Sequence, residues 1–367
     1  MKKHILFILH FPPPVHGSSV IGLQIKESKL INSEFDTRYI NLGTSKTIDE
    51  IQKFAFSKIF RYIAILGQVV YNLIFHRPDL CYLAITAEGN PFYKDALIVF
   101  IIKLFNVKLV YHLHNKGVSN SQNKFKDNLL YRIVFTNTGV ILLSQYLYPD
   151  VQKYVSLNNV YYCPNGIKQI ENIHPQEKAN DCVEILFLSN MIESKGVFVL
   201  LDACRILKMK NLKFHCTFIG GKGDITENQF EERIVENGLH DFAIYVGKKI
   251  GTEKNEFLAK ADIFAFPTYY EKETFGLVNL EAMQYELPVI STNEGGIPDV
   301  VIDGVTGFIV KQKDAKGLAE KLELLIIDKS LRKTMGENGR HRFEQNFTLH
   351  HFENKFAAIV NQVISTT

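Results

Sequence analysis

Residues 263–283 read IFAFPTYYEKETFGLVNLEAM, an apolar run followed by a polar stretch and then by a stretch that predicts a helix. The run Ile263–Phe266 contains no polar residue, which is typical of a strand buried on both faces of a sheet. A buried strand that leads through a loop into a helix is the repeating unit of α/β domains with parallel sheets. The stretch therefore predicts an α/β fold.

The same alternation of short β-rich runs and longer helical patterns fills most of the chain. Strands are predicted at residues 4–11, 37–42, 80–86, 108–114 and 139–144, and again at 183–189, 213–219, 243–247, 263–267, 288–292 and 307–310. Single hydrophobic cores stop growing at roughly 250–300 residues, so a chain of 367 residues predicts two domains.

Turn residues at 163–167 close a further strand, and a polar stretch without apolar periodicity follows from Lys168 to Asp181. This composition predicts a linker. We expect an N-terminal acceptor-binding domain at 1–166, a C-terminal nucleotide-sugar-binding domain at 167–345, and a helix at 346–367 that packs back on the first domain. Ligands of open α/β sheets bind at the carboxyl ends of the strands, which predicts a ligand site in a cleft.

Charge is distributed unevenly although the net charge is only +3. Residues 1–166 carry 18 lysines and arginines against 10 acids, whereas the remainder carries 24 against 29. The cations between Lys94 and Arg132 lie beside apolar helical patterns at 59–75 and 95–105, so an anionic membrane surface is one predicted partner. The alternative is a solvated helix face over an ordinary core.

Several classes of protein are disfavoured. Five scattered cysteines without a C-x-x-C pair argue against a disulfide scaffold or a cysteine zinc site. No signal peptide is evident, and the apolar run Tyr62–His76 falls short of the roughly 18 residues that a membrane span needs. We therefore expect a cytoplasmic protein, peripheral on the inner face of the membrane if it binds lipid. A sequence pI of about 8.4 without a recognisable motif gives little support to nucleic-acid binding.

Glu273 and Glu281 are eight residues apart, so on one continuous helix they would share a face. With Glu273 on the preceding loop, both could point into one cleft and accept hydrogen bonds from sugar or ribose hydroxyls. The free N–H groups of Phe275, Gly276 and Leu277 at the helix start would then favour a phosphate. The alternative is that Glu273 only stabilises the helix dipole and Glu281 is merely exposed.

The segment from Glu273 to Met283 resembles the Glu-x7-Glu signature of retaining glycosyltransferases of the family 4 type. The resemblance continues through the N-terminal loop at residues 12–19 and through residues 164–167, 187–197, 287–292, 295–299 and 303–308, and so spans nearly the whole chain. It implies the GT-B fold, with two Rossmann-like domains whose parallel sheets face a central cleft.

The resemblance also implies roles for single residues. Lys195 would pair with the donor diphosphate, Glu281 would hold the ribose hydroxyls, and Glu273 would contact the donor sugar near the reacting carbon. Many relatives have an arginine where Asn190 stands, and Lys248 is a candidate to replace that cation.

Two further candidates lie in the first half. Gly17 opens a predicted helix after the first strand, where amide groups could face the diphosphate or the acceptor. Alternation along the strand puts His112 and His114 on one face. The resemblance favours His114, with His112 as runner-up, as a contact of the donor sugar, and the alternative is a packed structural histidine.

The absence of any Asp-x-Asp sequence predicts a metal-independent enzyme, because lysine, backbone amides and helix dipoles must then neutralise the diphosphate. No phosphate-binding loop, dinucleotide fingerprint or serine nucleophile elbow is present.

We therefore expect a hexosyltransferase-like enzyme without a cofactor. It would move a sugar from a nucleotide diphosphate donor, with a UDP-sugar expected, to a glycan or lipid-linked sugar acceptor in bacterial surface polysaccharide or glycolipid biosynthesis. Retention is implied by the resemblance. The alternatives are a nucleotide-sugar epimerase of the same architecture and a non-catalytic sugar-binding or scaffold subunit.

Overall fold

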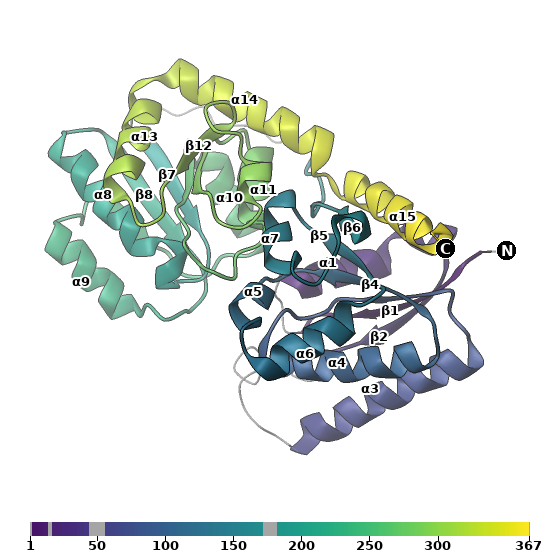
Figure 1. Ribbon diagram of the computed structural model, residues 1–367. Coiled ribbons are helices and arrows are strands. Elements are labelled where there is room, and N and C mark those ends of the chain that lie inside the picture. Colours follow the sequence, from purple (N-terminus) through teal and green to yellow (C-terminus); the bar gives the residue numbers. More distant parts are fainter. Residues whose placement is uncertain (1, 14–16, 44–55, 172–181, 367) are drawn as a thin grey trace. The chain divides into compact units, whose positions relative to one another are not determined.

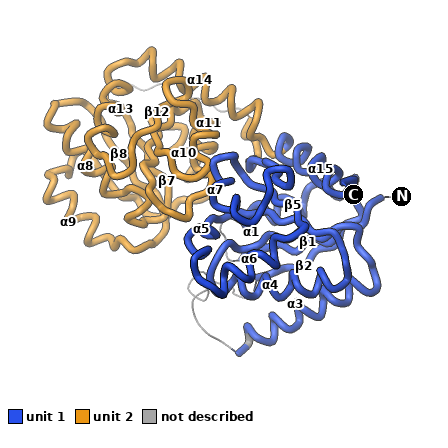
Figure 2. The backbone as a smooth tube through the Cα atoms, in the orientation of Figure 1, with its two compact units in different colours: residues 1–165, 350–367 blue, residues 166–349 orange. Residues whose placement is uncertain are grey.

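The computed structural model describes residues 2–13, 17–43, 56–171 and 182–366 (Figure 1). The chain divides into two compact units, one of residues 1–165 with 350–367 and one of residues 166–349 (Figure 2). Each unit is a parallel β-sheet with helices, so the predicted α/β class is confirmed. The larger part of the expected linker, residues 172–181, lies outside the described residues.

The sheet of unit 1 has six strands in the order β2-β1-β3-β4-β5-β6, and every pairing is parallel. The strands are β1 (His4–Leu9), β2 (Asp36–Asn41), β3 (Leu80–Leu83), β4 (Lys108–Leu113), β5 (Gly139–Leu142) and β6 (Val160–Tyr162). Strand β3 is buried along its whole length, and β1 and β4 are buried from their second residue onward, which explains their largely apolar sequences.

Helices cover both faces of this sheet. Because crossovers between parallel strands are right-handed, α3, α4 and α6 lie on one face (Figure 1). Phe356 of the last helix packs against Phe7 and Tyr82. The helices are α1 (Gly17–Glu27), α2 (Lys29–Glu34), α3 (Phe56–Phe75), α4 (Gly89–Leu104), α5 (Val118–Ser121), α6 (Phe125–Phe135), α7 (Tyr148–Val151) and α15 (Leu349–Ser365), with 3-10 turns at Gln145–Leu147 and Leu157–Asn159.

The sheet of unit 2 also has six parallel strands, in the order β12-β11-β10-β7-β8-β9. They are β7 (Val183–Leu188), β8 (Phe214–Ile219), β9 (Ala243–Tyr245), β10 (Ile263–Phe266), β11 (Val289–Thr292) and β12 (Gly307–Val310). The helices are the 3-10 helix η3 (Glu193–Lys195), α8 (Val197–Met209), α9 (Glu227–Asn237), α10 (Gly251–Lys260), α11 (Leu277–Gln284), α12 (Ile297–Val300), α13 (Ala315–Ile327) and α14 (Lys329–Asn346).

Every strand predicted from an apolar run is present, although most begin or end one to three residues inside the predicted bounds. The prediction that the apolar run Tyr62–His76 is too short to span a membrane needs correction. Helix α3 begins at Phe56, so its window Lys58–Phe75 is long and apolar enough, by length and composition alone, to cross a membrane. No other helix among the described residues meets that criterion.

Candidate functional site

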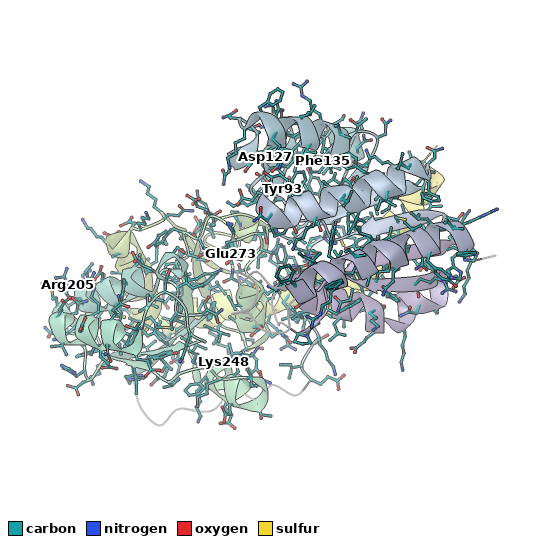
Figure 3. The ribbon with its side chains drawn as sticks, turned by 90° about the horizontal axis from the view of Figure 1, so that it is seen from below. Tyr93, Asp127, Phe135, Arg205, Lys248 and Glu273 are labelled. Carbon is teal, nitrogen blue, oxygen red and sulfur yellow. The ribbon has the colours of Figure 1, made fainter. Side chains whose placement is uncertain are left out.

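Glu273 lies on the loop between β10 and α11, because α11 begins only at Leu277 (Figure 3). A turn orders this loop, in which Glu273 N–H donates to the carbonyl of Tyr270 at 2.7 Å. The backbone at Gly295 packs closely against the same loop. A Cβ atom on Gly295 would lie 2.3 Å from the carbonyl oxygen of Glu273, so only glycine permits this close approach.

The carboxylate of Glu273 is bound at both oxygens. Lys195 Nζ lies 2.5 Å from Glu273 Oε2, and the N–H of Gly276 donates to Oε1 at 3.1 Å. The two charged side chains are only 15% and 13% exposed, so water screens their attraction weakly. The N–H of Gly276, expected from the sequence to face a phosphate, here donates to the carboxylate instead.

Lys195 reaches the Glu273 loop because η3 ends against the carboxyl end of β10, the strand from which that loop starts. Gly196 follows Lys195 with φ = +93°, and a Cβ atom there would lie 2.3 Å from the carbonyl oxygen of Pro267. The ammonium group of Lys195 also lies 4.3 Å from the centre of the Tyr270 ring, a cation–π distance. Lys195 therefore has a carboxylate and an aromatic face as neighbours and is held within hydrogen-bond reach of the Glu273 loop.

Asn190 and Lys248 both lie beside Gly221. A Cβ atom on Gly221 would be 2.9 Å from Asn190 Oδ1 and 3.7 Å from Lys248 Cδ. These residues follow three neighbouring parallel strands, β7, β8 and β9, so the fold brings their carboxyl ends together. Lys248 is exposed, and Figure 3 shows it in unit 2 with Glu273.

Glu281 lies on α11 and is paired with a residue that the sequence analysis missed. Lys254 Nζ of α10 lies 2.6 Å from Glu281 Oε2, and both side chains are about one quarter exposed. Both residues line a pocket of about 610 Å³ with Gln284 and Tyr285. No spacing along the chain could have indicated Lys254, because the ion pair joins side chains of two different helices.

The residues at the start of α11 and just before it have different environments. Phe275 is buried, and its ring packs edge-on against Phe347 at 6.0 Å. Leu277 is half-buried and Gly276 caps the helix with φ = +68°. The side-chain amide of Asn279 is fully buried and has no hydrogen-bond partner among the described residues. A Cβ atom on Gly276 would lie 2.7 Å from that amide nitrogen, so Gly276 has little room for a side chain.

In unit 1 the two candidate histidines are in contact at the end of β4. The His112 and His114 rings lie 4.1 Å apart between centres, and His112 Nδ1 lies 2.6 Å from the Tyr82 hydroxyl. Burial, with a smaller effect of His114, holds the pKa of His112 well below its usual value, so His112 is neutral at neutral pH. His112 is fully buried and His114 half-buried, which makes His114 the more accessible of the two.

Gly17 is the first residue of α1, and a Cβ atom there would meet no atom within 4 Å. Residues 14–16 of the same predicted loop lie outside the described residues. Across the described part of the chain, no group of three or more His, Cys, Asp or Glu side chains is placed to hold a metal ion.

Comparisons with known proteins agree with this architecture. Residues 169–342 match the family model described as Glycosyl transferases group 1. The chain is 35% identical over 192 residues to the capsular polysaccharide biosynthesis glycosyltransferase CapM of Staphylococcus aureus, a match that covers 50% of this chain and 49% of CapM. The chain therefore spans about half the length of that relative.

Solved structures match over the whole chain. A glycosyltransferase from Rickettsia africae aligns over 100% of both chains with a TM-score of 0.78 and 20% identity. Anabaena HepE, in a complex with UDP and glucose, covers 98% of this chain and 100% of its own with a TM-score of 0.71 and 18% identity. The fold is GT-B, as the resemblance predicted, and residues 169–342 are similar to the glycosyl transferases group 1 family.

Proposed function

We propose that this protein is a glycosyltransferase that moves a sugar from a nucleotide diphosphate donor, a UDP-sugar, to a glycan or lipid-linked sugar acceptor. The match of residues 169–342 to the group 1 family model supports the class of reaction. The relative CapM, named for capsular polysaccharide biosynthesis, supports a role in building a surface polysaccharide. The GT-B structure of HepE, which contains UDP and glucose, supports the choice of donor.

The observation that carries the proposal is the shielded pair of Lys195 and Glu273. A buried ion pair is costly to form unless both ions are well paired, and structural stability alone gives little reason to place one on a loop. Lys195 retains two further N–H donors that could bind a diphosphate oxygen while it holds Glu273. Glu273 in turn would present a fixed carboxylate to the hydroxyls of the donor sugar.

A second cation would come from Lys248. Its side chain reaches Gly221 beside Asn190, the position where many relatives have an arginine. Two lysines and the backbone amide groups of Phe275 and Leu277 would then neutralise the departing diphosphate, so we propose catalysis without a metal ion.

We propose transfer with retention of configuration at the anomeric carbon. The bond between that carbon and the phosphate oxygen breaks, and the acceptor oxygen bonds to the same face. The acceptor proton passes to the departing phosphate oxygen, so the protein need not supply a nucleophile or a base. The function of Glu273 would be to orient the donor sugar. His114 stays a predicted second contact of that sugar.

A Glu273→Gln variant tests this proposal. We expect turnover, followed as release of UDP from UDP-sugars in the presence of a polyprenyl-diphosphate-linked sugar, to fall by roughly 10²–10³-fold because the carboxylate acts mainly in the transition state. Glu271→Gln is a matched control, since Glu271 is exposed on the same loop and has no assigned role. Wild-type turnover in Glu273→Gln would contradict the assignment.

The same assay distinguishes a transferase from both alternatives, and analysis of the donor sugar distinguishes the two alternatives from each other. An epimerase would convert the donor sugar without an acceptor and without release of UDP. A non-catalytic subunit, which Asn190 in place of the usual arginine would favour, would bind the donor and release no UDP under any condition.

A further inference from the structure

Helices α3, α4 and α6 form a continuous layer on one face of the sheet of unit 1. The crossovers β2-α3-β3, β3-α4-β4 and β4-α6-β5 all run in the same direction across the sheet, so the helices lie on the same side. Figure 1 shows them next to one another, and Lys103 of α4 donates to the carbonyls of Ile133 and Thr136 at the end of α6. We call the outward side chains of these three helices the α3–α4–α6 face.

This face is unusually apolar. Phe60 is 72% exposed and Phe125 is 85% exposed, although aromatic rings of this size are normally buried in a soluble domain. The large apolar side chains that are exposed on the three helices are Phe56, Ile59, Phe60, Ile63, Tyr71, Ile74, Phe75, Leu97, Leu104, Phe125, Leu129 and Ile133. Apolar patches that extend over several elements mark binding surfaces rather than ordinary solvent contact.

The charges on this face are all positive. Helix α3 contains no acidic residue, and the single acids of α4 and α6, Asp95 and Asp127, are buried. Asp127 accepts a hydrogen bond from the Tyr93 hydroxyl at 2.6 Å, and Figure 3 shows these two side chains next to each other. The cations on the three helices are Lys58, Arg61, Lys94, Lys103, Lys126 and Arg132. Six cations among apolar side chains, with no exposed acid on these three helices, match the chemistry of an anionic lipid surface.

The contacts of α3 show that it packs against the rest of its unit, which argues against a helix that crosses a bilayer. Ile65, Val69 and Leu73, at four-residue spacing, form a buried stripe along the helix. The Tyr62 hydroxyl donates to the carbonyl of Lys94 at 2.6 Å, which ties α3 to α4. A helix that crossed the bilayer would have to give up these contacts with its own unit.

We propose that the α3–α4–α6 face docks the protein on an anionic membrane, with the exposed aromatic rings inserted among the acyl chains and the lysines and arginines at the phosphate level. Such a surface would bring the enzyme to a lipid-linked acceptor. The docking itself does not depend on the proposed function, because it needs neither donor nor acceptor.

Co-sedimentation of the full chain with vesicles tests the proposal. We expect binding to vesicles of phosphatidylcholine and phosphatidylglycerol that weakens with added salt, and little binding to phosphatidylcholine alone. Lys94→Glu with Arg132→Glu should lower the partition coefficient by more than tenfold, since each removed cation accounts for roughly fivefold. Phe60→Gln with Phe125→Gln should also lower it by at least about tenfold.

Matched controls lie on unit 2. Ile250→Gln with Ile327→Gln removes apolar side chains of similar exposure, 69% and 67%, and Lys260→Glu with Lys316→Glu reverses two exposed charges. These variants should bind vesicles like the wild type. All variants should keep the wild-type melting temperature, which excludes unfolding as the cause of lost binding.

Three outcomes would overturn the proposal. The first is the absence of wild-type sedimentation with anionic vesicles, and the second is an equal loss of binding in the face and control variants. The third is a change from dimer to monomer in Phe60→Gln with Phe125→Gln, measured by analytical ultracentrifugation, which would assign the face to a second copy of the chain. Nucleotide binding is measured separately, so each of these failures leaves the proposed function standing.

Discussion

Glu273 shows which properties of a single residue follow from sequence and which do not. Its place on a loop before a helix could be predicted, because Gly276 and the apolar residues from Leu277 onward indicate where the helix begins. Its ion pair with Lys195 could not, because 78 residues separate the two and only the packing of η3 against the end of β10 brings them together. The resemblance named both residues but implied different ligands for each, so their mutual contact is new information about the site without donor.

Lys254 and Asn279 are the residues that the sequence analysis missed. Neither has a spacing that distinguishes it from an ordinary helical residue. Lys254 is distinguished by its ion pair with Glu281 on another helix, and Asn279 by the burial of its amide group. Both are properties of the folded chain.

At the scale of a single residue, Asp95 makes the stability of unit 1 depend on pH. Burial raises the pKa of Asp95 from 3.8 to about 7, although the N–H of Thr86 partly offsets this by donating to its carboxyl group. The folded state therefore keeps a proton that the unfolded chain releases near pH 4. The free energy of unfolding should fall by about 1.4 kcal/mol for each pH unit between about pH 4 and about pH 7.

An Asp95→Asn variant removes this dependence, because the amide oxygen can still accept from Thr86 and cannot ionise. We expect the variant to be more stable than the wild type at about pH 8, and to differ much less at about pH 5. Urea denaturation of both proteins at both pH values measures the effect. Parallel losses of stability in wild type and variant would show that Asp95 is not the cause.

At the scale of elements, strands were easier to predict than the contacts between helices. Strands buried on both faces are apolar almost throughout, so runs such as 185–188 and 263–266 are visible in the sequence. The apolar run from Tyr62 predicts too short a helix, because α3 begins six residues earlier, at Phe56. The sequence predicted a basic and apolar first half, but not that the acids of α4 and α6 turn inward.

The turn between η3 and α8 depends on one glycine. Gly196→Ala would place a Cβ atom 2.3 Å from the carbonyl oxygen of Pro267, in addition to the strain of φ = +93°. Gly304, with φ = +74° and no atom within 4 Å of its Cβ position, is a matched control that carries only the backbone strain. We expect Gly304→Ala to cost about 1 kcal/mol and Gly196→Ala to cost about 3 kcal/mol or more.

Denaturant unfolding of the two variants measures this difference. Gly196→Ala should also weaken donor binding, because the backbone shift displaces Lys195. Equal stabilities of Gly196→Ala and Gly304→Ala would show that the turn can move away from Pro267 at no cost.

At the scale of the whole molecule, the chain consists of two α/β units, each built on a parallel sheet, and the two units have different surfaces. Unit 2 holds the shielded pair of Lys195 and Glu273 and the cation Lys248, and unit 1 holds the histidine pair and the α3–α4–α6 face. The predicted two-sheet architecture follows from the repeated strand–helix rhythm, which is a local property. The donor, the acceptor and the linkage depend on contacts with molecules that the sequence does not encode as a simple pattern.

We propose that unit 2 binds a nucleotide diphosphate sugar through lysines. Thermal unfolding in the presence of UDP, GDP, ADP and their common sugar conjugates, with and without EDTA, tests it most directly. A ligand that binds only the folded state raises the melting temperature, by a few degrees at about one hundred times its Kd. We expect a shift with UDP or a UDP-sugar that survives EDTA and is lost in Lys195→Ala but kept in Lys260→Ala. The absence of any shift at roughly millimolar nucleotide, or a shift that EDTA abolishes, would contradict the account.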